Sequence, residues 1–183
     1  QSPPRALFLS NGLFHERSTP SQKKYHLTAE TTSGNPSGVT ATTNTGHTLQ
    51  TDLPKRMGGK DEAAQPVELL LASLVGCTQA TAIFVGRNMQ PRVLIENVTI
   101  DIKAYREELG ALQLPIHKTP SVPSRLQEVS GTVKLQTDRP LNNDELLLLK
   151  EQTEARCPVA NMFLASGCRI DLTWTKTEAS SVQ

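Results

Sequence analysis

The sequence predicts an α+β fold in which a mostly antiparallel sheet packs around one long buried helix. The run between Glu68 and Arg87 is uncharged over about 18 residues and mainly apolar, which is typical of a helix buried on nearly every side. Segments in which apolar and polar residues alternate lie before and after this run, as expected of strands. The resulting order, strands, a helix, strands, helices and a strand, favours α+β over a parallel α/β fold.

Length and composition limit the class of protein. The chain has 183 residues, enough for one domain, and 37% of them are hydrophobic. A net charge of +1 and an aromatic content of 4% give no indication of a nucleic-acid-binding surface. Three cysteines are too few for a disulfide-stapled miniprotein. The sequence has no CxxC, HExxH or glycine-rich phosphate motif, so we expect no metal and no cofactor.

The first half of the chain is expected to contain three short strands and the long helix. Residues 24–52 are rich in threonine, and glycines divide them into strands at Tyr25–Ala29, Val39–Asn44 and His47–Asp52. Pro54 and the pair Gly58–Gly59 predict a loop over 53–60. Pro66 suits the first turn of a helix, which we expect to end near Asn88.

The second half is expected to alternate between strands and helices. Proline-rich residues 107–123 predict a loop, and an asparagine at 142 or 143 is a good cap for the helix that follows it. The expected strands are 92–105, 126–137 and 168–177, and the expected helices are 144–154 and a second one from Cys157–Pro158 to about Gly167.

The two ends of the chain differ from this domain, which we place at 24–178. Residues 1–23 hold several prolines, serines and arginines with a single acidic residue, Glu16. This composition fits the remnant of an organelle transit peptide, hence a mitochondrial location, or a loosely docked terminus of a cytoplasmic protein. Residues 179–183 form a polar tail. Polar residues such as Ser73 and Gln79 within the apolar helix favour burial in protein over a membrane span.

The cysteines are the candidate chemical groups. By position alone, Cys77 in the apolar helix reads as an inert core residue, because free cysteines are commonly buried. Cys157 precedes Pro158 and is therefore expected to cap a helix, where unpaired N–H groups favour the thiolate and Arg156 adds positive charge. The alternative is that Cys157 only caps the helix and Arg156 points to solvent. Cys168 has no visible activating group and reads as structural.

Two segments together resemble the OsmC/Ohr family, the osmotically inducible and organic-hydroperoxide-resistance proteins. The first begins with Thr51-Asp52-Leu53-Pro54 and Gly58-Gly59 and continues through Gln65-Pro66-Val67-Glu68-Leu69-Leu70-Leu71-Ala72-Ser73-Leu74-Val75-Gly76-Cys77-Thr78. The second is Glu154-Ala155-Arg156-Cys157-Pro158-Val159-Ala160. In element order the resemblance extends from about residue 25 to 176.

The resemblance implies a thiol peroxidase without metal or haem, built as an intertwined homodimer with active sites at the subunit interface. By motif, Cys77 is the attacking cysteine and becomes a sulfenic acid, and Cys157 resolves it as a disulfide. The implied substrates are organic, fatty-acid-type hydroperoxides, and the implied reductant is a dihydrolipoyl-type dithiol.

Two further residues match the family pattern less closely. An attacking thiol in an apolar helix needs a nearby cation, and Arg56 matches the family's arginine with about one residue of extra spacing. The Ohr-type acid lies ten residues before the cysteine, where this chain has Val67. Glu68, nine residues before, is the candidate partner of that arginine. At about 100° per residue it lies opposite Cys77, so Glu68 fits equally well as a first-turn acid that complements the helix dipole.

These departures leave a second class of function open. Val67 and the spacing of Arg56 are compatible with a non-catalytic OsmC-fold stress protein that binds a small hydrophobic ligand. The presence of both Cys77 and Cys157 favours the peroxidase, because a binding protein has no need of the pair.

Overall fold

Helix α1, Pro66–Asn88, is the longest element of the chain, and its bounds are those predicted. The computed structural model describes residues 22–177. The predicted leader lies outside the described residues up to position 21, and the predicted tail at 179–183 lies outside them entirely. The Glu68 carboxylate accepts a hydrogen bond from the Gln65 N–H at 2.8 Å, which satisfies one of the unpaired donors at the start of α1.

The second half of the chain forms a three-stranded sheet in the order β4–β5–β6. Strands β4, Ile95–Tyr105, and β5, Glu128–Thr137, pair antiparallel. Strand β6, Arg169–Lys176, pairs with β5 in the parallel direction. The fold is therefore α+β with mostly antiparallel pairing, as predicted, but it contains two separate sheets and one parallel pair. The parallel pair arises because two helices intervene between β5 and β6 and return the chain to its starting end.

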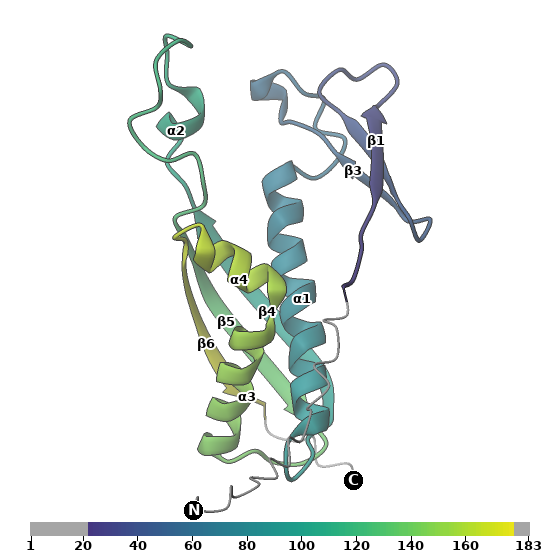
Figure 1. Cartoon of the computed structure of the whole chain (residues 1–183), viewed down its shortest axis with the longest axis vertical. Coiled ribbons are helices and arrows are strands. Elements are labelled where there is room, and N and C mark those ends of the chain that lie inside the picture. The colour runs from purple at the N-terminus through teal and green to yellow at the C-terminus, as the bar shows by residue number, and fades with distance from the viewer. Residues whose placement is uncertain (1–21, 178–183) are drawn as a thin grey trace, which may run out of the picture.

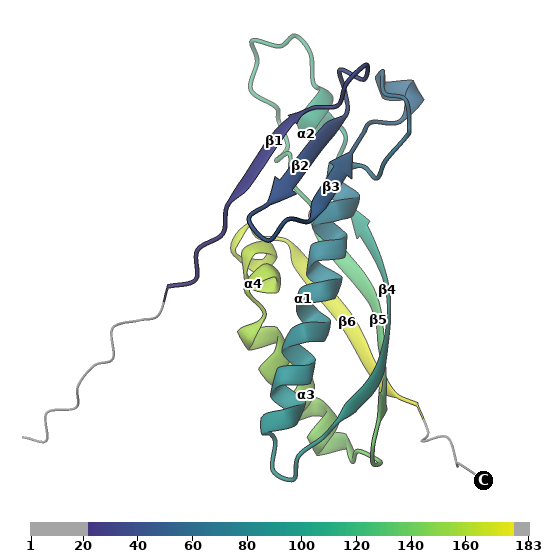
Figure 2. The ribbon, with the colours of Figure 1, turned by 90° about the vertical axis from the view of Figure 1, so that its right-hand side faces the viewer.

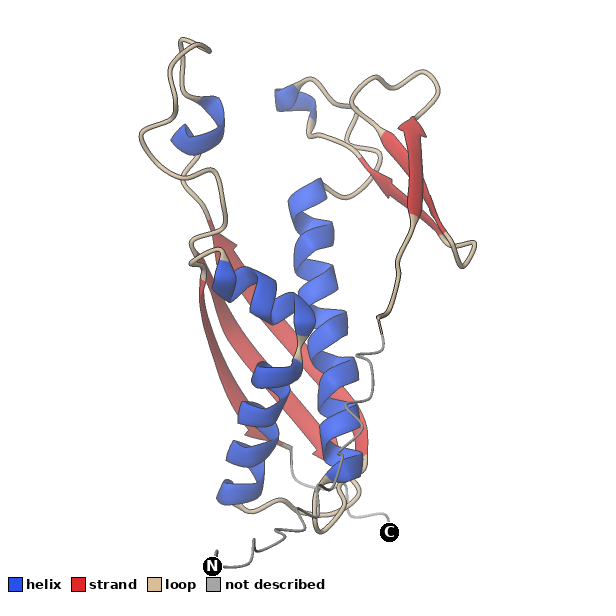
Figure 3. Cartoon of the chain, in the orientation of Figure 1, coloured by secondary structure: helices blue, strands red, loops and turns tan. Residues whose placement is uncertain are grey.

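Helices α1, α3 (Asn143–Arg156) and α4 (Pro158–Ala165) cover one face of this sheet, as Figures 2 and 3 show. Alternate strand residues face the helices, while polar residues of the same strands face outward. Two apolar clusters lie between the layers. The buried members of one are Ala82, Val85, Met89, Val93, Val133, Leu135, Leu141, Leu149, Leu172 and Trp174, and those of the other are Leu74, Leu126, Val129, Cys157, Ala160, Phe163 and Cys168.

The first half of the chain forms a smaller antiparallel sheet of β1 (Leu27–Thr31), β2 (Val39–Thr43) and β3 (Thr48–Thr51). Figure 1 shows it beyond the N-terminal end of α1, apart from the β4–β6 sheet. Every residue of β1 is exposed. At the same end of the molecule, the predicted loop 107–123 contains one short helix, α2 (Leu109–Leu112), and extends away from β4 and β5.

Within the single chain α1 is buried on one face only, so the predicted burial on nearly every side needs a second copy of the chain. Only 28% of its most apolar 18-residue window is buried, and Phe84 is 59% exposed. One face of α1 packs on α3, α4 and β4, and no described segment of the chain covers the opposite face. By length and composition alone α1 passes the test for a membrane span, with a mean hydropathy of 1.8, a test that core helices also pass.

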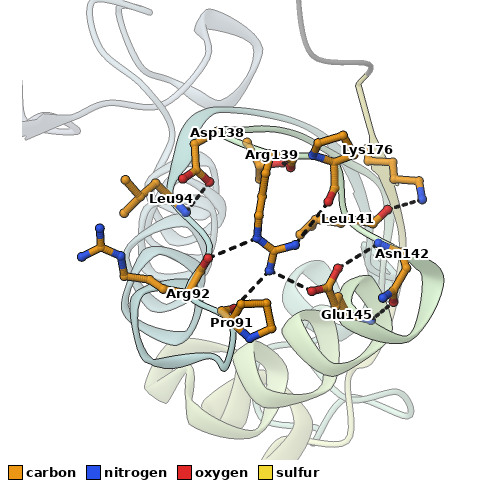
Figure 4. Close-up of polar contacts among 11 residues, drawn as sticks. Pro91, Arg92, Leu94, Asp138, Arg139, Leu141, Asn142, Glu145 and Lys176 are labelled. Carbon is orange, nitrogen blue, oxygen red and sulfur yellow. Dashed lines mark hydrogen bonds and ion pairs between the residues drawn. The ribbon is translucent and has the colours of Figure 1, made fainter.

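A network around Arg139 ties the far end of α1 to the start of α3 (Figure 4). The Arg139 guanidinium donates to the backbone carbonyls of Pro91 and Arg92 at 3.1 and 3.2 Å, and to the Glu145 carboxylate at 2.8 Å. Asn142 caps α3, because its side chain accepts from the Glu145 N–H at 2.8 Å. The bond from Arg139 holds the pKa of Glu145 below its usual range. These bonds fix the turn that sends β4 back along the helices.

Candidate dithiol site

The structure brings Cys77 and Cys157 together. Cys77 lies near the middle of α1, and Cys157 lies in the junction between α3 and α4. Cys77 is partly buried and packs against the apolar cluster that contains Cys157, which is only 1% exposed. Both thiols are free in this structure. Two segments 80 positions apart in the sequence thus form one site, as the resemblance implied.

Cys157 caps α4, as the sequence predicted. Its Sγ accepts a hydrogen bond from the Ala160 N–H at 3.4 Å. The expected stabilisation of the thiolate is nevertheless outweighed, because burial raises the pKa of Cys157 above its usual value. The bonds from Ala160 and from the Thr78 side chain act in the opposite direction, while the Cys77 thiol adds to the rise in pKa. Arg156 is not among the groups that shift this pKa, and its guanidinium donates to the Gln152 side chain one turn earlier in α3.

A small cavity of about 60 Å³ lies beside Cys157. Most of its lining is apolar, but it also includes Thr78, Thr153, Glu154 and Trp174. Within residues 22–177, the Thr153 Oγ1 and the Trp174 Nε1 are the buried side-chain polar atoms that have no hydrogen-bond partner. Sequence reasoning missed both residues, since Thr153 reads as part of an amphipathic helix and Trp174 as the apolar position of a strand. Thr153 lies in α3 and Trp174 in β6, so the two residues line one cavity only because α3 packs on β6.

Arg56 lies in the short 3-10 helix η1, Lys55–Met57, in the loop that joins β3 to α1. Its side chain is 73% exposed, and its guanidinium lies 3.9 Å from the Glu108 carboxylate, which is itself 67% exposed. An ion pair this exposed contributes little to stability. Within one chain the structure therefore places Arg56 with Glu108 rather than with the two thiols.

The loop that carries Arg56 is anchored by the buried carboxylate of Asp52. Its oxygens accept from the Asn35 side chain at 2.9 Å and from the backbone N–H groups of Leu53, Lys60 and Glu62 at 2.7–3.2 Å. Burial alone raises a carboxyl pKa, but these bonds outweigh it and hold the pKa of Asp52 well below its usual range. The loop returns against its own backbone at Gly59, where a Cβ atom would lie 1.8 Å from the Leu53 carbonyl oxygen. The bonds to Asp52 and the close approach at Gly59 therefore fix the backbone path of this loop.

Glu68, the remaining predicted site residue, and the two residues Val67 and Cys168 have mainly structural surroundings. Glu68 caps α1 and is exposed, which corresponds to the first-turn alternative stated above. Val67, in place of the Ohr-type acid, is 37% exposed. Cys168 is buried, its Sγ lies 3.6 Å from the Arg169 carbonyl oxygen, and burial raises its pKa. Among the described residues, no group of three or more His, Cys, Asp or Glu side chains is arranged to hold a metal ion.

Fold and site together define a two-cysteine α+β protein, in which a thiol on a long central helix contacts a thiol at the start of a second helix. The sequence matches the OsmC-like protein family over residues 59–173, and the chain belongs to that family. None of the curated proteins compared with the chain matches it.

Solved structures show the same fold. An OsmC-like protein from Mycoplasma pneumoniae is similar with a TM-score of 0.66 at 21% identity, covering 86% of this chain and 100% of its own. An organic hydroperoxide resistance protein from Elizabethkingia anophelis has a TM-score of 0.60 at 17% identity, covering 87% and 100%. An organic hydroperoxide resistance protein OsmC from Legionella pneumophila has a TM-score of 0.54 at 19% identity, covering 85% and 99%.

Proposed function

We propose that this chain is a thiol peroxidase that reduces organic hydroperoxides. The observation that carries the proposal is the approach of Cys77 and Cys157 in one apolar cluster. Family membership and the similarity to proteins described as organic hydroperoxide resistance proteins support it. The reductant that we propose is a dihydrolipoyl-type dithiol, as the family resemblance implies.

In the proposed reaction Cys77 is the attacking residue. Its thiolate attacks the terminal oxygen of the hydroperoxide, the O–O bond breaks, the alcohol leaves, and Cys77 becomes a sulfenic acid. Cys157 then attacks the Cys77 sulfur, and a disulfide and water form. The assignment follows exposure: Cys77 is partly accessible, whereas Cys157 is 1% exposed and has a raised pKa, which suits a thiol that reacts second.

The surroundings of Cys77 favour a substrate with an apolar tail. Leu70 and Leu74 lie seven and three positions before Cys77, on adjoining parts of the helix surface, and Leu70 is 46% exposed. Each methylene group buried against such residues contributes roughly 0.8 kcal/mol. We therefore expect an alkyl hydroperoxide to react faster than hydrogen peroxide.

We also propose that the active form is a homodimer that covers the free face of α1. This face presents Leu70, Gly76, Ala80 and Phe84. Glycine inside a helix costs about 1 kcal/mol relative to alanine. No described atom lies within 4 Å of a Cβ built at Gly76, so packing within the chain does not require glycine there. A second α1 could approach this position closely, and the protruding β1–β3 sheet gives each subunit an arm that reaches its partner.

A non-catalytic protein that binds a small hydrophobic ligand remains the second candidate, because Arg56 is paired with Glu108 in this structure. Intact mass distinguishes the two. After one equivalent of an alkyl hydroperoxide, the peroxidase loses the mass of two hydrogen atoms as the disulfide forms, and Cys157→Ser stops at a sulfenic acid that dimedone traps. Cys77→Ser should not consume the peroxide, while Cys168→Ser serves as the control. An unchanged wild-type mass would refute the peroxidase and leave the binding protein.

A further inference from the structure

The cavity beside Cys157 is more polar than its position in the core requires. Thr153 and Trp174, at 1% and 7% exposure, line the cavity, and neither the Thr153 hydroxyl nor the Trp174 indole N–H has a partner among the described residues. A buried polar group without a hydrogen bond destabilises the folded state, because it loses its bonds to water on burial. Two such groups on one wall indicate that something in the cavity satisfies them.

Size and chemistry identify the occupant. The cavity volume of about 60 Å³ exceeds the roughly 10–15 Å³ that one water molecule needs. A buried water also needs two to four polar partners, and the wall offers Thr78, Thr153, Glu154 and Trp174 beside the Cys157 sulfur. The wall combines donors and acceptors, which water matches because it both donates and accepts. An apolar guest would leave both unpaired groups unsatisfied.

We propose that this cavity holds ordered water, and that the water takes up the proton that Cys157 loses when it forms the disulfide with Cys77. The second half of this statement rests on the proposed peroxidase function. The Cys157 S–H proton passes to the water, and the sulfur electron pair attacks the Cys77 sulfenic sulfur. The S–O bond breaks, and the departing hydroxide takes a proton from solvent to become water. The net reaction converts one thiol and one sulfenic acid into a disulfide and water.

Glu154 connects the cavity to solvent. It lines the cavity, yet its side chain is 39% exposed and its carboxylate lies 3.9 Å from the Lys150 ammonium group. Burial raises the pKa of Glu154, Lys150 opposes the rise and Glu151 adds to it, which makes the carboxylate a better proton acceptor. Helix α4, packed beside it, carries no charged residue. Glu154 therefore acts through the water as the positioning and accepting residue of the relay.

Whether Thr153→Val raises or lowers Tm tests for water in the cavity. Threonine and valine have similar shapes and helix propensities. If water bonds the Thr153 hydroxyl, Thr153→Val should lower Tm by about 2–4 °C, and a crystal structure should show water beside Trp174. If the cavity is dry, the same change removes an unsatisfied group and raises Tm, which overturns the proposal. Thr137→Val is the calibrating control, because that hydroxyl donates to the Arg139 carbonyl oxygen at 2.7 Å.

Single-turnover kinetics test the relay. Glu154→Gln should leave sulfenic acid formation unchanged and slow disulfide formation by roughly 10²-fold, the lower end of what a general base contributes. Asp144→Asn, an exposed acid on the same helix that does not act on the pKa of Glu154, is the matched control, and Glu154→Asp should recover part of the rate. Disulfide formation at the wild-type rate in Glu154→Gln overturns the relay. If the wild-type protein forms no sulfenic acid, the proposed function fails and the relay with it, whereas the Tm measurement still decides whether the cavity holds water.

Discussion

Replacing Phe84 by serine should separate the proposed dimer into monomers. Phe84 is 59% exposed in the single chain, and an aromatic side chain presents roughly 200 Å², so about 120 Å² is open to a partner. At about 25 cal/mol per Å², burial of this area contributes about 3 kcal/mol per subunit and about 6 kcal/mol per symmetric dimer. Loss of that contribution raises the dimer dissociation constant by about four powers of ten.

Sedimentation velocity over a range of protein concentrations measures this change. Serine and phenylalanine have similar helix propensities, so the far-ultraviolet circular dichroism of Phe84→Ser should match that of the wild type. Leu147→Gln on α3 is the control, because Leu147 is 53% exposed but lies away from the free face of α1. A wild-type protein that is monomeric at micromolar concentration, or a Phe84→Ser variant that dimerises with wild-type affinity, would refute the reasoning.

Three further predictions concern the loop, the buried thiol and the cavity. Gly59→Ala should open the loop 53–61 and speed its cleavage by trypsin, because the new Cβ would lie 1.8 Å from a backbone oxygen; Gly76→Ala, which meets nothing, should leave cleavage unchanged. Because the pKa of Cys157 is raised in the folded state, the folded protein holds this proton more tightly than the unfolded chain does. Its contribution to the unfolding free energy is therefore fully present below the ordinary pKa of 9.0 and is lost as pH rises above it. Urea unfolding should therefore show a fall in unfolding free energy above about pH 9 that Cys157→Ser reduces; an equal fall in both proteins contradicts this. Trp174, the single tryptophan, should change its emission when hydroperoxide oxidises the protein, and Cys157→Ser should abolish the change. Unchanged emission despite a disulfide detected by mass would place the reaction away from the cavity.

The elements could be predicted where local signals act. Pro66 at the first helical position and the apolar run that follows it define α1, and Asn142 and Pro158 mark the starts of α3 and α4. The cap at Cys157 follows from its position before a proline. The meeting of the two cysteines followed from family resemblance, because spacing alone does not place residues from different helices together.

What the sequence could not reveal depends on packing between distant segments. An apolar helix has the same sequence pattern whether its second face is covered by its own chain or by another, so the sequence does not identify which face of α1 stays uncovered in the single chain. Of the two interpretations of Cys157, the structure favours the simple cap, because burial raises the pKa of the thiol and this burial depends on α1 and the sheet. The cavity and the Arg139 network join residues that no local pattern relates.

The two thiols lie on different kinds of backbone: Cys77 within a helix and Cys157 at the junction of two helices. Cys77 lies inside a continuous helix of 23 residues, where moving the backbone would break several helical hydrogen bonds at once. Cys157 occupies a joint, being both the last cap of α3 and the first cap of α4, with extended backbone angles of φ −73° and ψ 109°. Its Sγ accepts from the Ala160 N–H at 3.4 Å and from the Thr78 side chain, and it is packed in an apolar cluster. If the proposed disulfide forms, the backbone change it needs is therefore expected at the junction between α3 and α4 rather than within α1.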